Sequence, residues 1–168
     1  MGDAAAPLAE LRRRGEAVEA RFERRLDHPP KALWRMLTDP QALPSWLAPG
    51  RIDLALGGPA RLDFFDSGTV IESTVTALEP GRLLEYSWSR PGEPERPVRW
   101  RVEPEGEGAR LELTLIVPAG EDPGRACAGW EAHLEMLAAA LEDAPIRFPF
   151  ERFKAAREAY RAKVLELG

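Results

Sequence analysis

In the middle of the chain apolar and polar positions alternate along short segments, which is typical of β-strands with one buried face. Leu111, Leu113 and Leu115, for example, alternate with polar residues. Tight turns such as Gly57-Gly58-Pro59 and Glu79-Pro80-Gly81 separate the segments, and strands joined by short turns pair antiparallel. The pattern predicts strands at residues 17–26, 51–56, 60–65, 69–78, 83–89, 98–102 and 110–117.

Two short helices are predicted between the first two of these strands. Pro29-Pro30 opens the first helix, since proline is tolerated in a first helical turn. Asp39-Pro40 ends it and starts a second helix, which Pro49-Gly50 ends. The apolar residues at helical spacing are Leu33, Trp34, Leu37, Leu43, Trp46 and Leu47.

One long amphipathic helix is predicted at residues 121–143, after the last strand. Its stripe is formed by Trp130, Leu134, Leu137 and Leu141, which fall within an arc of about 60° at 100° per residue. A further amphipathic helix follows Pro145, with an apolar side made of Phe150, Phe153, Tyr160, Val164 and Leu167. Packing of this side on the domain's own sheet is the favoured expectation, ahead of a homodimer contact and a membrane-surface helix.

The chain is expected to form one domain with an extension at each end. Residues 8–13 and 17–26 predict a hairpin with Gly15 at its turn, although the first arm could equally be a helical turn or a loose tail. We therefore divide the chain into an N-terminal extension at 1–16, a central domain at 17–143 and an additional C-terminal helix at 144–168.

Composition excludes several classes of protein. The 168 residues carry a net charge of −5, which argues against a general nucleic-acid binder. Residues 145–168 nevertheless carry a net charge of +3, for which a basic helix on an acidic body is the simplest explanation. The longest apolar run is far below the roughly 20 residues of a membrane span. A single cysteine, Cys127, and the lack of a signal-like N-terminus favour the cytoplasm.

A set of ordered motifs resembles a known superfamily. These are Leu33-Trp34-Arg35-Met36-Leu37-Thr38-Asp39-Pro40, the Trp-Leu-x-Pro at 46–49, the Tyr86/Trp88 strand, the strand of Leu111 and Leu113, and Gly129-Trp130. Together, over about residues 17–142, they resemble the SRPBCC (START-like) superfamily, in its branch similar to the C-terminal domain of the activator of heat shock protein 90 ATPase.

The resemblance implies a fold of the α+β class, the helix-grip fold. In this fold a six- or seven-stranded antiparallel sheet curves around the long C-terminal helix, and two short helices close one end. Members of the superfamily include lipid carriers, hormone receptors, cyclases and chaperone activators, so the fold alone does not give the function.

The candidate binding site is a set of aromatic residues facing the expected space between sheet and long helix. Its members are Trp34, Trp46, Phe64, Tyr86, Trp88, Trp100 and Trp130, with His133 as a polar contact. Ligand pockets are mostly apolar with a few placed polar groups. The competing explanation is that these rings fill a core, since each buries roughly 150–250 Å². For the set as a whole we favour a cavity.

Other chemistry has little support in the sequence. His133 could act as a general base near neutral pH, or could be a boundary histidine bonded to the sheet. His28 and His133 are far apart and, with Cys127, give no metal-ligand spacing, so neither a metal nor a cofactor is expected. Cys127 is better explained as a buried structural residue than as a nucleophile.

The sequence therefore favours non-catalytic binding of a small hydrophobic or aromatic molecule. A chaperone-associated protein-interaction module is the first alternative, and a cyclase- or hydratase-like enzyme using His133 is the second. Neither a catalytic residue nor a reaction is assigned. A homodimer is left open.

Overall fold

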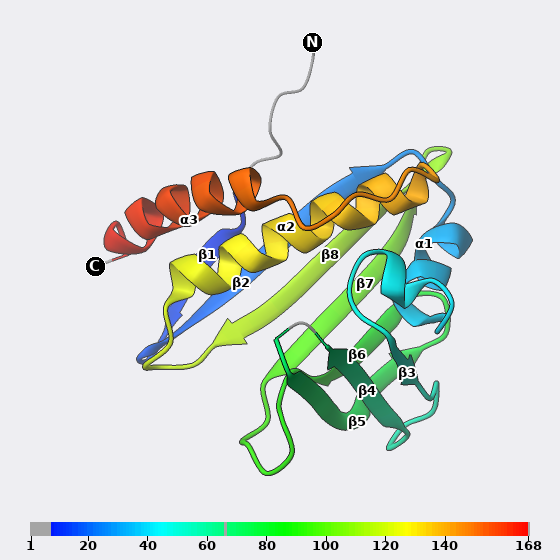
Figure 1. The fold of residues 1–168 in the computed structure, drawn as a ribbon, viewed down its shortest axis with the longest axis horizontal. Coiled ribbons are helices and arrows are strands. Elements are labelled where there is room, and N and C mark those ends of the chain that lie inside the picture. The colour runs from blue at the N-terminus through cyan, green and yellow to red at the C-terminus, as the bar shows by residue number, and fades with distance from the viewer. Residues whose placement is uncertain (1–7, 66, 168) are drawn as a thin grey trace.

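The computed structural model describes residues 8–65 and 67–167, and it contains one antiparallel sheet, two long helices and a short helical corner (Figure 1). The strands are β1 (Glu10–Arg14), β2 (Ala17–Leu26), β3 (Gly50–Ile52), β4 (Pro59–Phe64), β5 (Thr69–Glu79), β6 (Leu83–Ser87), β7 (Pro97–Glu105) and β8 (Gly108–Val117). The helices are α1 (Pro30–Thr38), the 3-10 turn η1 (Leu43–Ser45), α2 (Pro123–Leu141) and α3 (Phe150–Leu165).

The described strands form an eight-stranded sheet in the order β1-β2-β8-β7-β6-β5-β4-β3. Each neighbouring pair is antiparallel, and buried and half-buried positions alternate along the whole of β8. This confirms the helix-grip prediction, with more strands than the expected six or seven. The first arm of the N-terminal hairpin is a strand, with Arg14 opposite Ala17. The predicted second strand is shorter than expected, because Leu54 and Leu56 lie exposed in the loop after β3.

The sheet curves around α2, as Figure 1 shows. A register shift between Val75 and Ala77 interrupts the β5–β6 pairing, and such bulges bend a strand. The α2 helix is capped by Asp122, whose carboxylate accepts hydrogen bonds from the backbone N–H groups of Gly124 and Arg125. A cap of this kind contributes about 1 kcal/mol to helix stability. The apolar stripe of α2 enters the same core as the inward residues of β2 and β8.

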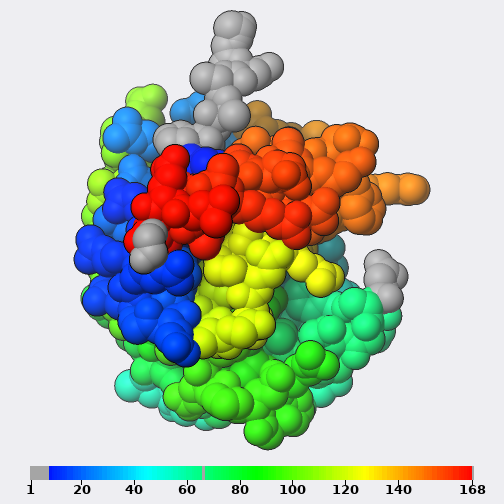
Figure 2. Space-filling view, turned by 90° about the vertical axis from the view of Figure 1, so that its left-hand side faces the viewer, coloured from blue at the N-terminus to red at the C-terminus, as the bar shows by residue number. Residues whose placement is uncertain are grey.

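The α3 helix packs mainly on α2, and it reaches the sheet through Tyr160, whose ring centroid lies 6.3 Å from that of Phe22 in β2. The favoured expectation, that the C-terminal apolar side packs on the sheet, is corrected accordingly. Figure 2 shows α3, in red and orange, lying over the yellow start of α2. Tyr160 is buried, but Phe150 is 67% exposed, so the predicted stripe is covered only in part. Gly124 permits the close approach, since a Cβ atom there would lie 2.7 Å from Cγ of Arg161. The α3 helix thus covers the side of α2 that faces away from the sheet, over the first part of α2.

The prediction of a second short α-helix is corrected by the structure. The second short helix is a 3-10 turn of three residues, η1, and not an α-helix. Among the described helices, none is long and apolar enough to cross a membrane. The predicted N-terminal extension lies partly outside the described residues, since 1–7 are not described.

Candidate functional site

Seven of the eight predicted site residues form one connected set of aromatic rings, which we call the ring cluster. It comprises Trp46, Phe64, Tyr86, Trp88, Trp100, Trp130 and His133. Trp130 and His133 come from α2. Alternation along β4, β6 and β7 places Phe64, Tyr86 and Trp100 on the inner face of the sheet. The cluster therefore lies between sheet and helix, where the sequence predicted it.

One end of the ring cluster is a filled core. Trp46, Tyr86 and Trp100 are each at most 1% exposed. The rings of Trp46 and Trp100 meet edge to face with centroids 5.6 Å apart. Trp100 Nε1 donates to the Tyr86 hydroxyl at 3.3 Å, and Trp46 Nε1 donates to the Met36 carbonyl at 2.7 Å. Burial raises the pKa of Tyr86, so its hydroxyl stays protonated. These three buried rings form the closed end of the ring cluster, against which the partly exposed rings pack.

The other end is partly exposed, and we call Phe64, Trp88 and His133 the open end. Trp88 lies edge to face against Trp130 at 4.7 Å between centroids and against Phe64 at 5.8 Å. Phe64 in turn meets His133 at 6.1 Å. Each of the three open-end side chains is only half-buried. Apolar ring surface is thus available to a molecule arriving between sheet and helix.

Trp34 lies apart from this arrangement. It is half-buried on α1 and packs against the edge of the core. Within residues 8–65 and 67–167, no ring contact joins it to the ring cluster. The reason is its position on the helix: Leu33, Met36 and Leu37 form the buried face of α1, and Trp34 flanks that face.

His133 is oriented by a contact with the backbone of Trp46, the residue that follows η1. Its Nδ1 lies 2.9 Å from the carbonyl oxygen of Trp46. A carbonyl oxygen only accepts, so Nδ1 carries the proton and Nε2 of the neutral ring is an acceptor. Burial lowers the pKa of His133, and this outweighs the opposing effect of the bond to Trp46. The open end therefore contains a neutral imidazole at physiological pH.

Phe148 is an aromatic neighbour that the sequence patterns did not indicate. It lies in the segment between α2 and α3, and its ring meets His133 at 5.6 Å between centroids. His133 is thereby in contact with Phe64, Trp130 and Phe148. The segment has no regular structure and therefore no hydrophobic period. The only signal was the apolar Phe-Pro-Phe sequence at residues 148–150.

Serine hydroxyls occur on both faces of the sheet. The Ser87 and Ser89 hydroxyls are 2.8 Å apart, and Ser87, which also accepts from the Arg96 amide, shares the outer face of β6 with Glu85. The Ser73 hydroxyl is buried, and within the described part of the chain it has no hydrogen-bond partner. Ser73 shares the inner face of β5 with Ile71 and Val75, because residues two apart point to the same side. Ser73 is therefore a polar group on the inner face of the sheet.

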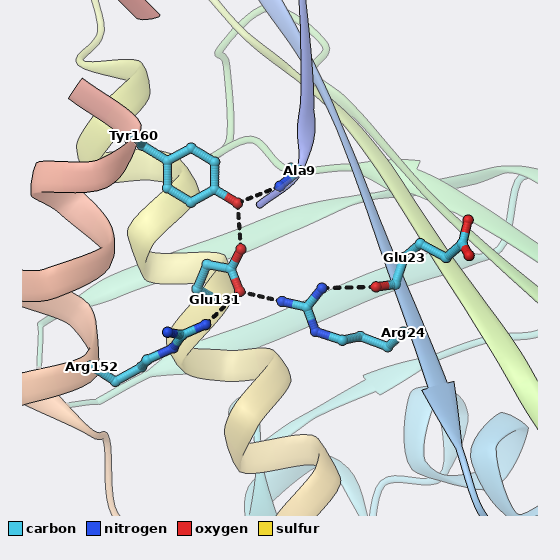
Figure 3. Close-up of polar contacts among 6 residues, drawn as sticks. All are labelled: Ala9, Glu23, Arg24, Glu131, Arg152 and Tyr160. Carbon is cyan, nitrogen blue, oxygen red and sulfur yellow. Dashed lines mark hydrogen bonds and ion pairs between the residues drawn. The ribbon is translucent and has the colours of Figure 1, made fainter. Parts of the chain in front are cut away.

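A separate buried polar cluster joins α2, α3 and β2, as Figure 3 shows. Glu131 is 1% exposed and receives hydrogen bonds from Arg24, Arg152 and the Tyr160 hydroxyl. The same hydroxyl accepts from the Ala9 amide at 2.7 Å. One sequence signal existed: Arg24 occupies an inward position of β2, in step with Phe22. A charged residue there requires a buried partner.

Nucleophilic or metal chemistry finds no further support. Burial raises the pKa of the Cys127 thiol to about 12, so the group is protonated and inert. Among the described residues, no group of His, Cys, Asp and Glu is arranged to hold a metal ion. An open depression of about 450 Å³ lies at the β7–β8 turn, between Arg25–Asp27 and Glu105–Ala109. It contains none of the ring-cluster residues.

The chain is similar to one protein family and to several solved structures. The family model described as Activator of Hsp90 ATPase homolog 1-like protein matches residues 27–142. Among curated proteins, no sequence matches the chain. CalU16 from Micromonospora echinospora is 26% identical with a TM-score of 0.74, covering 92% of this chain and 94% of its own.

Two other solved structures are similar. EF2215 from Enterococcus faecalis, a conserved protein of unknown function, has a TM-score of 0.80 at 19% identity and shows the fold alone. The match covers 95% of this chain and 92% of that one. DynU16, a protein in the dynemicin biosynthetic locus, is 27% identical with a TM-score of 0.68. The match covers 76% of this chain but 48% of DynU16.

Proposed function

The chain belongs to the family of Activator of Hsp90 ATPase homolog 1-like proteins, and from this premise we propose that it binds a small aromatic molecule between its sheet and α2. The molecule is bound and not converted. The observation that carries the proposal is the gradient of exposure along the ring cluster. The rings at the closed end are covered, while Phe64, Trp88 and His133 keep accessible surface.

Ring surfaces at the open end favour a flat ligand. Phe64 and Trp88 lie at 72° to one another, and His133 lies at 74° to Phe64. A planar molecule can therefore meet the face of one ring and the edge of another, which are the preferred aromatic geometries. The closed end behind them is densely packed, so the supporting rings keep their positions when a ligand arrives.

The polar groups narrow the ligand further. His133 presents Nε2 as an acceptor, because Nδ1 is committed to the Trp46 carbonyl. A neutral imidazole favours a donor such as a phenolic hydroxyl over a carboxylate. We therefore expect hydroxylated aromatic molecules to bind better than the same molecules without the hydroxyl.

The direct test uses 2-naphthol as the probe and tryptophan emission with calorimetry as the readouts. We expect saturable binding of one molecule per chain, with naphthalene binding more weakly. At 100 times the dissociation constant, 2-naphthol should raise the free energy of unfolding by about 2.7 kcal/mol. Absence of saturable binding by either method would contradict the proposal.

Two tryptophans provide a matched pair of variants. Trp88→Ala removes a ring of the open end, and we expect it to weaken binding of 2-naphthol by about tenfold. Trp34→Ala removes an equally half-buried indole outside the ring cluster and should leave the affinity unchanged. His133→Phe keeps a ring but removes the acceptor, so it should abolish the preference for 2-naphthol over naphthalene.

A second function is suggested by the family and by the surface. The family name refers to activation of the Hsp90 ATPase, and Leu54 and Leu56 expose apolar side chains in the loop before β4. Such residues suit contact with a protein partner. Measuring the ATPase rate of the host cell's own Hsp90 with this protein and with a Leu54→Ser/Leu56→Ser variant would decide it. Equal rates in the presence and absence of the protein would exclude activation.

A further inference from the structure

We propose that residues 142–149 form a strap that opens and closes over the binding site, with Phe148 as the residue that gates ligand entry. The proposal rests on the function proposed above and adds a residue to it. Phe148 lies outside the segment that the family model matches, which ends at residue 142. The gate is therefore a feature of this chain's C-terminal extension.

The strap begins with a reversal of the chain at the end of α2. Asp143 has a positive φ of 59°, and the Ala144 amide donates to the Ala139 carbonyl at 3.0 Å. This is the Schellman arrangement, in which one residue in the left-handed conformation terminates a helix. The following residues consequently run back along α2 toward its middle, where His133 lies, as the orange segment in Figure 1 shows.

Between its ends the strap is weakly held. At one end Glu142 bonds through its carboxylate to the His28 ring. At the other end the Pro149 carbonyl accepts from the Phe153 amide at 2.9 Å. Residues 145–148 make no backbone hydrogen bond within the described chain. Segments with few backbone bonds open at low free-energy cost, so this one can move without unfolding the domain.

Phe148 is the contact that holds the middle of the strap inward. Its ring is half-buried against His133, with centroids 5.6 Å apart, and it also meets Phe150 at 4.9 Å and Phe153 at 5.7 Å. Ile146 on the strap and Phe150 at the start of α3 are 41% and 67% exposed. Phe148 is thus the strap side chain placed over the open end, and its removal uncovers His133.

The helix that follows the strap is fixed, which confines motion to the strap. Tyr160 and Arg152 of α3 bond to the buried Glu131 of α2 (Figure 3). Arg161 pairs with Asp122, the residue that caps α2, at 3.1 Å. Because α3 is tied to α2 at two places, Phe148 can swing away while α3 stays docked. The structure thus contains a movable cover between two fixed supports.

A gate is distinguished from a residue that only lines the site by its effect on the rates of ligand binding. A cover slows both entry and exit, so its removal speeds both while the dissociation constant changes less. The experiment is stopped-flow mixing of the full-length protein with 2-naphthol, followed by tryptophan emission. Phe148→Ala should raise the association and dissociation rates by about fivefold or more, from the loss of one aromatic contact.

Ile146→Ala is the matched control, because it removes an exposed apolar side chain from the strap itself and should leave both rates at the wild-type value. A second readout needs no ligand. Phe148→Ala, and not Ile146→Ala, should increase quenching of tryptophan emission by acrylamide, since loss of the ring uncovers His133, which packs on Trp130. Circular dichroism of both variants checks that α3 remains folded.

The outcomes separate the two proposals. If wild type and Phe148→Ala bind 2-naphthol with equal rates, the gate is wrong and the binding function stands. If only Phe148→Ala binds, Phe148 is a fixed plug that does not open in the wild-type protein, and both the gate and the binding function of the wild-type protein are wrong. If neither protein binds and acrylamide quenching is also equal, both proposals fail. Faster association with an unchanged dissociation rate would make Phe148 an obstacle and not a gate, and would overturn it.

Discussion

The Tyr160 hydroxyl accepts a hydrogen bond of 2.7 Å from the Ala9 amide, joining residues 151 positions apart in the sequence. The same hydroxyl donates to Glu131, and Lys163 donates to the Ala9 carbonyl at 2.7 Å. Both backbone groups of Ala9 are therefore satisfied by side chains of α3. In this way the last helix fixes the segment that leads into the first strand.

Tyr160→Phe should lower the free energy of unfolding by about 1–3 kcal/mol, because it leaves the Ala9 amide and a Glu131 oxygen without a partner. Urea denaturation measures the loss. Hydrogen exchange at the Ala9 amide gives the local readout, and it should accelerate in the variant. Unchanged exchange at Ala9 would show that this bond does not hold the N-terminal segment.

Glu131→Ala should cost about 3–5 kcal/mol, because it leaves the largely buried guanidinium of Arg24 without its counter-charge. The double variant Arg24→Met/Glu131→Leu removes both charges and should be clearly more stable than Glu131→Ala in the same urea titration. Glu72→Ala breaks an exposed pair with Arg61 and should cost less than about 1 kcal/mol. A double variant as unstable as Glu131→Ala would contradict this account.

His133 should make stability depend on pH. Its pKa in the folded protein lies below the ordinary 6.5, chiefly because of burial, so the unfolded chain takes up the proton first. The contribution to stability is therefore complete above about pH 6.5 and is lost as the pH falls toward the folded pKa. We expect the fall in unfolding free energy between about pH 7.5 and pH 5.5 to be smaller in His133→Phe. Parallel profiles for the two proteins would refute the assignment.

Asp143→Gly should stabilise the protein by about 0.5–1 kcal/mol, because glycine adopts the left-handed conformation without a Cβ penalty. For a chain of this size that corresponds to a rise in melting temperature of about 1–4 °C. Asp143→Ala keeps a Cβ at the same φ and should give no gain. A melting temperature that rises equally in both variants would show that the backbone conformation is not the cause.

Most of the fold was predictable because strand alternation and turn chemistry act over short stretches. The parity of Tyr86 and Trp100 placed both rings on the inner face, where the structure has them. Trp34 lies at the edge of the buried face of α1 and outside the ring cluster, because helical spacing fixes a stripe only to within a residue at its edge.

The other differences have a common physical cause. A helical wheel assigns a carboxylate such as Glu131 to solvent, and only a partner distant in sequence, here Tyr160 or Arg24, makes its burial tolerable. The position of α3 was wrong for the same reason, since its docking depends on that buried contact. Phe148 lies in a segment without periodic structure, so no pattern could assign it to the ring cluster.

The packing of α3 against the first half and middle of α2 encloses that part of the helix, with the sheet on one side and a second helix on the other. Its backbone amide protons are consequently shielded from solvent on opposite sides. We expect the middle of this helix to exchange with deuterium only when the entire domain unfolds, so that its slowest amides report the global free energy of unfolding directly.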